Sequence, residues 1–125
     1  MTERTSKVLR NWAAAYLIAF PFAARAQDVD AGKQVFSQCA ACHSVDGSNG
    51  AGPSLKGIVG SKAGDSPGFR FSRAMKNSGT VWDAKTLDAY IADPQAAMPG
   101  NVMPHSGLID AKQRTDLVAY LQTLK

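Results

Sequence analysis

The residues best suited to chemistry in this chain lie together in the stretch Cys39-Ala40-Ala41-Cys42-His43. Two cysteines three positions apart, with a histidine directly after the second, are the arrangement that attaches a c-type haem. On a helical turn, this spacing holds both sulfur atoms on one edge of the ring, where they form thioether bonds with its vinyl groups. His43 lies beside the second cysteine and can place a ring nitrogen on the iron. We therefore predict one covalent haem c.

Other uses of a Cys-x-x-Cys pair are less consistent with the chain. A structural zinc site needs four Cys or His ligands, whereas this chain has two cysteines and two histidines, of which His105 is far from the pair. A thioredoxin-like pair belongs to a βαβ unit, and the surrounding residues have no strand pattern. A disulfide between Cys39 and Cys42 would close a very small loop and stabilise little. Haem attachment is the favoured interpretation.

The first 26 residues have the layout of a secretory signal peptide. Three basic residues (Arg4, Lys7 and Arg10) precede an apolar run over residues 12–24, and Ala24-Arg25-Ala26 forms an A-x-A cleavage site. The alternative is an uncleaved membrane anchor, but the apolar run is shorter than the roughly 18 residues that span a bilayer. We expect residues 1–26 to be removed on export to the periplasm. Residues 27–125 then form the single domain, without a membrane span.

Most of the basic charge belongs to the predicted signal peptide. The whole chain has a formal charge of +4, and residues 1–26 contain four basic residues and one acidic residue. The mature domain therefore has a formal charge of about +1, which gives no support to nucleic-acid binding.

The rest of the sequence predicts helices separated by long loops. Asp28 and Asp30 suit a helix start, and we expect that helix to run into the cysteine motif. Residues 47–68 are rich in glycine and proline and should form a long loop around a cofactor. No alternation typical of strands is present, so we predict an all-α fold. Further helices are expected over residues 72–77, over residues 84–92 before Asp93-Pro94, and from Asp110 to the C-terminus.

The residue on the other side of the iron has several candidates. Met75 lies on a predicted helix, where a methionine is more often part of the core. Met98 and Met103 lie in a segment rich in proline and glycine that could present a thioether, and a His/Met pair suits an electron carrier. His105 is a third candidate, because haem can also be bound by two histidines. Spacing does not choose among Met98, Met103 and His105.

The motif is accompanied by a set of residues spread along the chain: Gly32 and Phe36, the Cys39–His43 motif, Gly52–Gly57, Pro67–Phe69, Trp82, Tyr90, Asp93-Pro94, Met98–Met103, Leu117 and Tyr120. In this combination, from Asp28 to Leu124, the chain resembles class I cytochromes c of the soluble mitochondrial and bacterial type. This resemblance implies a small fold of helices and loops around one covalent haem, with Met103 as the distal ligand. It also implies that the Pro53 carbonyl accepts the His43 ring N–H, that Trp82 reaches a haem propionate and that Tyr90 lies near the Met103 sulfur.

The resemblance further implies a monomeric one-electron carrier that is not an enzyme. Its partners would be redox proteins, an electron donor and an acceptor, such as a dehydrogenase, a cytochrome complex or a terminal oxidase. Two alternatives are a haem peroxidase or gas-binding cytochrome with an open distal site, and a dedicated subunit of one dehydrogenase. Several positions that are often basic in the mitochondrial proteins, such as Gln38, Gln95 and Val102, are neutral here. We therefore expect weak electrostatic steering toward an acidic partner.

Overall fold

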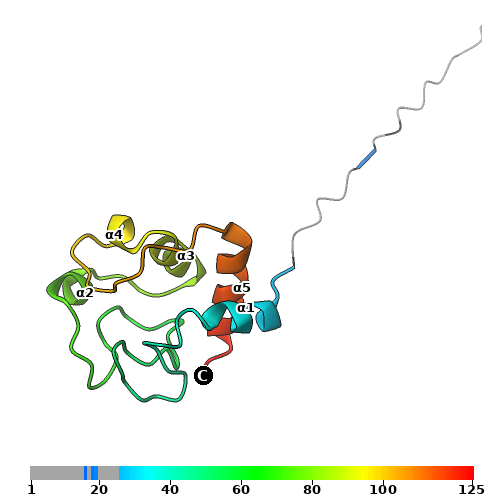
Figure 1. Cartoon of the computed structure of the whole chain (residues 1–125). Coiled ribbons are helices and arrows are strands. Elements are labelled where there is room, and N and C mark those ends of the chain that lie inside the picture. The colour runs from blue at the N-terminus through cyan, green and yellow to red at the C-terminus, as the bar shows by residue number, and fades with distance from the viewer. Residues whose placement is uncertain (1–15, 17, 20–25) are drawn as a thin grey trace, which may run out of the picture.

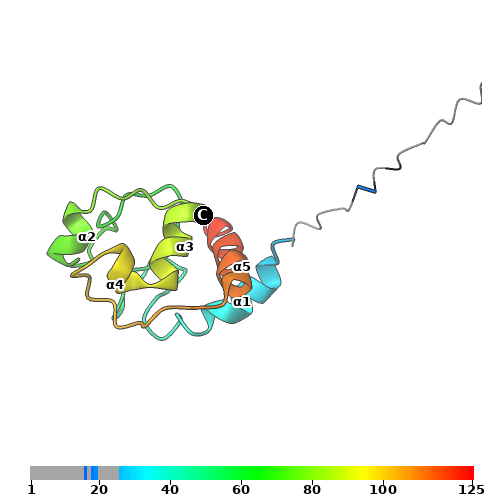
Figure 2. The same ribbon diagram turned by 90° about the horizontal axis from the view of Figure 1, so that it is seen from above.

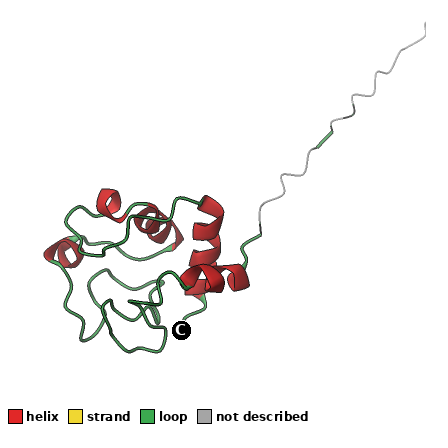
Figure 3. Ribbon diagram, viewed as in Figure 1, coloured by secondary structure: helices red, strands yellow, loops and turns green. Residues whose placement is uncertain are grey.

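The structure, a computed structural model, describes residues 16, 18, 19 and 26–125. This part contains five α-helices joined by long loops and no strand (Figure 3), which confirms the predicted all-α fold. Its only β-type pairing is one isolated bridge between Lys62 and Val81. None of the helices described is long and apolar enough to cross a membrane. The helices are α1 (Val29–Phe36), α2 (Arg73–Asn77), α3 (Ala84–Ala92), α4 (Pro94–Ala97) and α5 (Ala111–Gln122).

Almost all of the predicted signal peptide lies outside the described residues. Its predicted cleavage after Ala26 therefore remains a prediction, as does the boundary of a domain that begins at residue 27. The folded part begins with Asp28, which caps α1: its side chain accepts a hydrogen bond from the backbone N–H of Ala31.

The first and last helices cross at one end of the fold, as Figures 1 and 2 show from two directions. Gly32 lies at the crossing, where a Cβ atom would be only 2.5 Å from the carbonyl carbon of Asp116 on α5 and 2.9 Å from the Cβ of Tyr120. The ring of Phe36 lies 5.5 Å from that of Tyr120. The close crossing of α1 and α5 therefore depends on the absence of a side chain at position 32.

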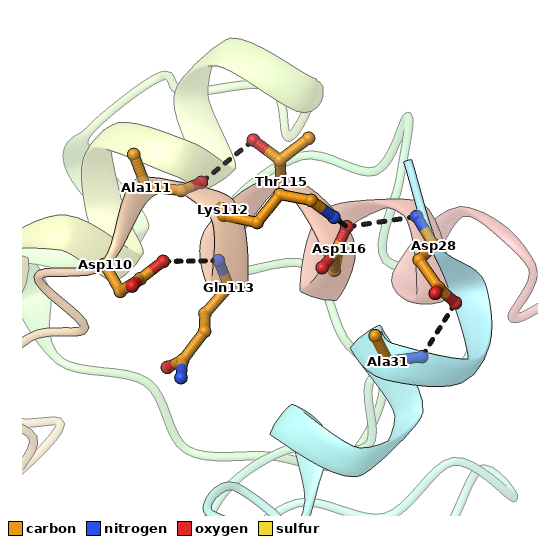
Figure 4. A network of polar contacts seen from close by, with 8 residues as sticks. All are labelled: Asp28, Ala31, Asp110, Ala111, Lys112, Gln113, Thr115 and Asp116. Atoms are coloured by element: carbon orange, nitrogen blue, oxygen red, sulfur yellow. Dashed lines mark hydrogen bonds and ion pairs between the residues drawn. The ribbon is translucent and has the colours of Figure 1, made fainter. Parts of the chain in front are cut away.

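A buried carboxylate on α5 also holds the start of α1 (Figure 4). Asp116 is 4% exposed, and its Oδ1 accepts hydrogen bonds from the Asp28 backbone N–H at 3.0 Å and from the Lys112 Nζ at 2.5 Å. The hydrogen bond from Lys112 and then that from Asp28 lower the pKa of Asp116. Residue type and spacing alone do not single out Asp116, because its role depends on the approach of α1.

Local capping residues set the ends of the middle helices. Ser72 accepts from the Met75 N–H at the start of α2, and Asp83 and Thr86 form a reciprocal capping box at the start of α3. Asp93 follows the end of α3 and also caps α4, with Pro94 in its first turn. Helices α2 and α3 were predicted from the sequence, whereas α4 was not.

The expectation that the first helix continues into the cysteine motif is wrong. The α-helix ends at Phe36, and the chain continues in tighter turns, in which the Cys39 N–H donates to the Phe36 carbonyl at 2.8 Å. The His43 N–H donates in turn to the Cys39 carbonyl at 2.9 Å. The motif is therefore held by successive turns that follow the helix.

The core surrounds a cavity between these helices and the loops. α5 is buried on all sides from Asp116 to Leu121, because it packs against α1 and α3 and also contributes to the cavity wall. The buried apolar residues are Phe36, Ala63, Trp82, Leu87, Tyr90, Met98, Leu117, Val118, Ala119, Tyr120 and Leu121.

Candidate haem-binding site

A cavity of about 370 Å³ lies inside the fold. Its size falls within the usual range for sites that enclose a small molecule or cofactor, about 300–1,000 Å³. The wall is mainly apolar, and its large apolar members are Phe36, Leu55, Ile58, Phe69, Phe71, Met75, Trp82, Leu87, Ile91, Leu117 and Leu121. The residues predicted to bind haem also line it, namely Cys39, Cys42, His43, Pro53, Trp82, Tyr90 and Met103.

The two cysteines enter the cavity from the turns after α1. Both thiols are free and partly buried. Burial raises the pKa of the Cys39 thiol, and the nearby Cys42 raises it further. The thiols are therefore partly shielded from solvent and close to one another, as attachment to one ring edge requires. No group of three or more His, Cys, Asp or Glu side chains suitable for a metal ion is found among the described residues.

His43 is held by the loop that begins at Gly52. Its Nδ1 lies 2.7 Å from the Pro53 carbonyl oxygen, which can accept a hydrogen bond from the ring. A Cβ on Gly52 would lie 2.7 Å from Cε1 of His43, so only glycine allows this approach. When Nδ1 is protonated and its N–H donates a hydrogen bond to this carbonyl, Nε2 remains free to bind a metal. The geometry thus suits a proximal ligand with a defined tautomer.

Trp82 and Tyr90 form an aromatic pair on another part of the wall. Their ring centroids are 5.1 Å apart, and both side chains are buried. Burial raises the pKa of Tyr90 to about 12, so its hydroxyl stays protonated at neutral pH. This hydroxyl donates to the Oδ1 of Asn101 at 3.3 Å. Asn101 is the functional candidate that the sequence analysis missed.

The structure places the methionines that spacing left as candidate ligands in different surroundings. Met98 is 6% exposed and belongs to the core, and it does not line the cavity. Met103 is half-buried and lines the cavity, as does Met75 on α2. Met75 and Met103 thus both reach the cavity, whereas Met98 belongs to the core.

His105 also borders the cavity, but near its cysteine-bearing edge. It lines a second, much smaller hollow together with Gln38, Cys39 and Leu108. Its Nδ1 accepts a hydrogen bond from the Gly107 N–H at 3.0 Å. This position is consistent with a residue at the edge of the site.

The residues present fit a covalently bound haem. The cavity is mainly apolar, two thiols lie together at one edge, and a histidine and a methionine line the same space. These features define a c-type haem protein with a helical fold.

Comparisons with known proteins agree with this class. The family model for cytochrome c matches residues 29–125. Cytochrome c2 of Rhodomicrobium vannielii is 49% identical over 94 residues, which cover 74% of this chain and 75% of the relative. Cytochrome c2 of Rhodoblastus acidophilus is 46% identical over 102 residues, or 80% of this chain and 95% of the relative. The solved structure of cytochrome cH from Methylobacterium extorquens aligns with a TM-score of 0.75 and 45% identity, covering 77% of this chain and 98% of that one.

The chain belongs to the cytochrome c family. Members of this family bind haem c covalently and act as electron carriers, not as enzymes. The small all-α cytochrome c fold expected from the sequence is confirmed.

Proposed function

We propose that this protein is a periplasmic one-electron carrier with His43 and Met103 as the axial ligands of one haem c. Cys39 and Cys42 anchor the ring, Trp82 contacts a propionate, and Tyr90 lies on the Met103 side. The observation that carries the proposal is that all these side chains line one apolar cavity. When bound, the haem supplies the one-electron change between ferric and ferrous iron.

The chain's own residues then keep the site rigid and dry. The Pro53 carbonyl, 2.7 Å from the His43 Nδ1, orients the imidazole and increases its basicity. The apolar wall excludes water, and a thioether ligand in such surroundings favours the reduced state. If His43 and Met103 both bind the iron, no open position would remain for a substrate. This distinguishes a carrier from a peroxidase or a gas-binding protein.

Electrons would enter and leave where the cavity reaches the surface beside Met103. Val102 lines the cavity and is also 74% exposed. A monomer with this surface can meet a donor protein and an acceptor protein in turn. We propose that these partners are a dehydrogenase, a cytochrome complex or a terminal oxidase. Residues 1–26 would direct export and be removed in the process, which the mass of the protein isolated from the periplasm tests.

The axial ligands are tested by optical spectra of the oxidised holoprotein and of two matched variants. Ligation of ferric haem by methionine gives a weak charge-transfer band at the red end of the visible spectrum. We expect this band in the wild type and in Met75→Leu, and its loss in Met103→Leu, because leucine conserves volume without a sulfur ligand. A wild-type protein that lacks the band and binds carbon monoxide readily would refute the proposed ligation.

A further inference from the structure

Asn101 is a buried polar residue in the segment that presents Met103. Its side chain is 6% exposed, and it lies between the buried Met98 and Met103. In Figure 1 this segment runs as a loop from α4 toward α5. A buried amide is costly unless its hydrogen bonds are made, so the partners of Asn101 show what it holds in place.

The Asn101 side chain makes four hydrogen bonds. Its Nδ2 donates to the carbonyl oxygens of Pro94 at 2.7 Å and Met98 at 2.9 Å. Its Oδ1 accepts from the Met103 backbone N–H at 3.0 Å and from the Tyr90 hydroxyl at 3.3 Å. An amide has two N–H donors and one oxygen with two lone pairs, so its capacity is fully used.

These bonds join residues 98–103, here called the Met103 segment, to α3 and α4. Tyr90 is on α3 and Pro94 begins α4, whereas Met98 and Met103 lie at the two ends of the segment. The Gln95 side chain adds a bond from α4 to the Asn101 carbonyl at 3.0 Å. Beyond Met103, the Leu108 N–H donates to the Ile91 carbonyl on α3 at 2.8 Å. Met103 therefore lies between two attachments, and the one nearer to it depends on Asn101.

Aspartate, alanine and the hydroxyl residues cannot make the same set of bonds. Aspartate keeps the accepting oxygen but loses both donors, and alanine loses all four bonds. A hydroxyl residue has only one hydrogen to donate, so it leaves one of the two carbonyl oxygens without its partner. Removing one partner of a buried hydrogen bond lowers stability strongly, because the other partner is left buried and unsatisfied.

We propose that Asn101 is a positioning residue that keeps the Met103 thioether on the iron by tying its segment to α3 and α4. This inference rests on the proposed function, since it requires Met103 to be the ligand. A competing ligand can displace Met103 only when the segment swings away from the helices. That movement breaks the bonds from Asn101 to Tyr90 and Pro94. Their loss should therefore make displacement easier even when the rest of the fold is unchanged.

Imidazole titration of the oxidised holoprotein measures this displacement. We expect Asn101→Ala and Asn101→Asp to bind imidazole roughly tenfold to a hundredfold more tightly than wild type, the factor that follows from losing one or two buried hydrogen bonds. The charge-transfer band should also disappear at a lower temperature than in wild type, with a smaller change in the temperature at which helical structure unfolds. Asn77→Ala and Asn77→Asp, at the exposed end of α2, provide the same chemical changes away from the segment and should match wild type.

Wild-type imidazole affinity and band stability in both Asn101 variants would overturn the inference while leaving Met103 ligation intact. A wild type without the band would instead refute the proposed function. Hydrogen exchange of the wild-type holoprotein gives an answer that does not depend on any variant folding. The Met103 amide hydrogen, bonded to Asn101, should exchange much more slowly than that of exposed Val102, and equal rates would also overturn the inference.

Discussion

Replacing Gly32 with alanine should destabilise the protein strongly, although alanine is normally the better helix residue. By propensity alone the change in an exposed helix would add about 1 kcal/mol of stability. At Gly32, however, the new Cβ would lie 2.5 Å from the Asp116 carbonyl carbon and 2.9 Å from the Tyr120 Cβ. These atoms belong to a buried helix and cannot rotate away, so α1 and α5 must move apart.

The size of the effect follows from the packing that this movement disrupts. Overpacking a well-packed core costs about 1–3 kcal/mol, and contact with backbone atoms is the unfavourable end of that range. Separation of the helices would also weaken the Phe36–Tyr120 contact and the hydrogen bond from Asp28 to Asp116. We expect a net loss of about 2 kcal/mol, which in a domain of this size lowers Tm by roughly 10 °C.

Thermal unfolding of the holoprotein, followed by far-ultraviolet circular dichroism, measures this change. Gly50→Ala is the matched control, because a Cβ there would lie 3.6 Å from the Cys42 carbonyl oxygen, an ordinary contact. The control should unfold within a few degrees of wild type. If Gly32→Ala unfolds at the same temperature as the control, the close crossing of α1 and α5 does not determine stability and the reasoning is refuted.

Three further changes test other parts of the structure. Arg114 donates to the Asp88 carboxylate and to the Leu108 and Ile109 carbonyl oxygens, so Arg114→Ala should lower the free energy of unfolding in urea by about 2 kcal/mol, and Arg114→Lys should restore little because lysine lacks the fork of donors. The pKa of Asp116 is lowered in the fold, so its stabilising effect is present above the ordinary value of 3.8 and is lost as the pH falls through the lower folded value. Unfolding of Asp116→Asn should therefore depend less on pH between about pH 6 and about pH 2 than that of wild type, and equal slopes would contradict this. The rate of electron transfer to a partner protein should change little with added salt, because residues 27–125 carry a formal charge of only about +1, and a steep fall would contradict weak steering.

Signals close together in the sequence predicted much of the fold. Asp83 begins α3 and Asp93-Pro94 ends it, and Ser72 caps α2, because capping and the restrictions of proline act over a few residues. The missed helix α4 had a local signal as well: Asp93 followed by Pro94 is also a helix start. The same two residues end one helix and begin the next, and only the first role was recognised.

The boundary of α1 was harder to predict from local signals. Residues 37–42 have no proline or glycine, and nothing in their types requires the α-helix to end at Phe36. In the fold, the turns that follow bring Cys39, Cys42 and His43 to the cavity, and the Gly52 N–H donates to the Cys42 carbonyl at 2.8 Å. The end of α1 is therefore a result of packing against the loop after the motif.

The sequence by itself determined the chemistry of the attachment motif, since Cys39, Cys42 and His43 are adjacent in the chain and their spacing is a local property. Only the tertiary structure decided which of Met98 and Met103 faces the cavity. The two residues share one segment, yet Met98 is buried in the core and Met103 lies on the cavity wall. Asn101 and Asp116 likewise acquire their roles from hydrogen bonds to residues on other elements. Residue type and spacing specify local geometry, whereas the partner of a buried polar group depends on how distant segments pack.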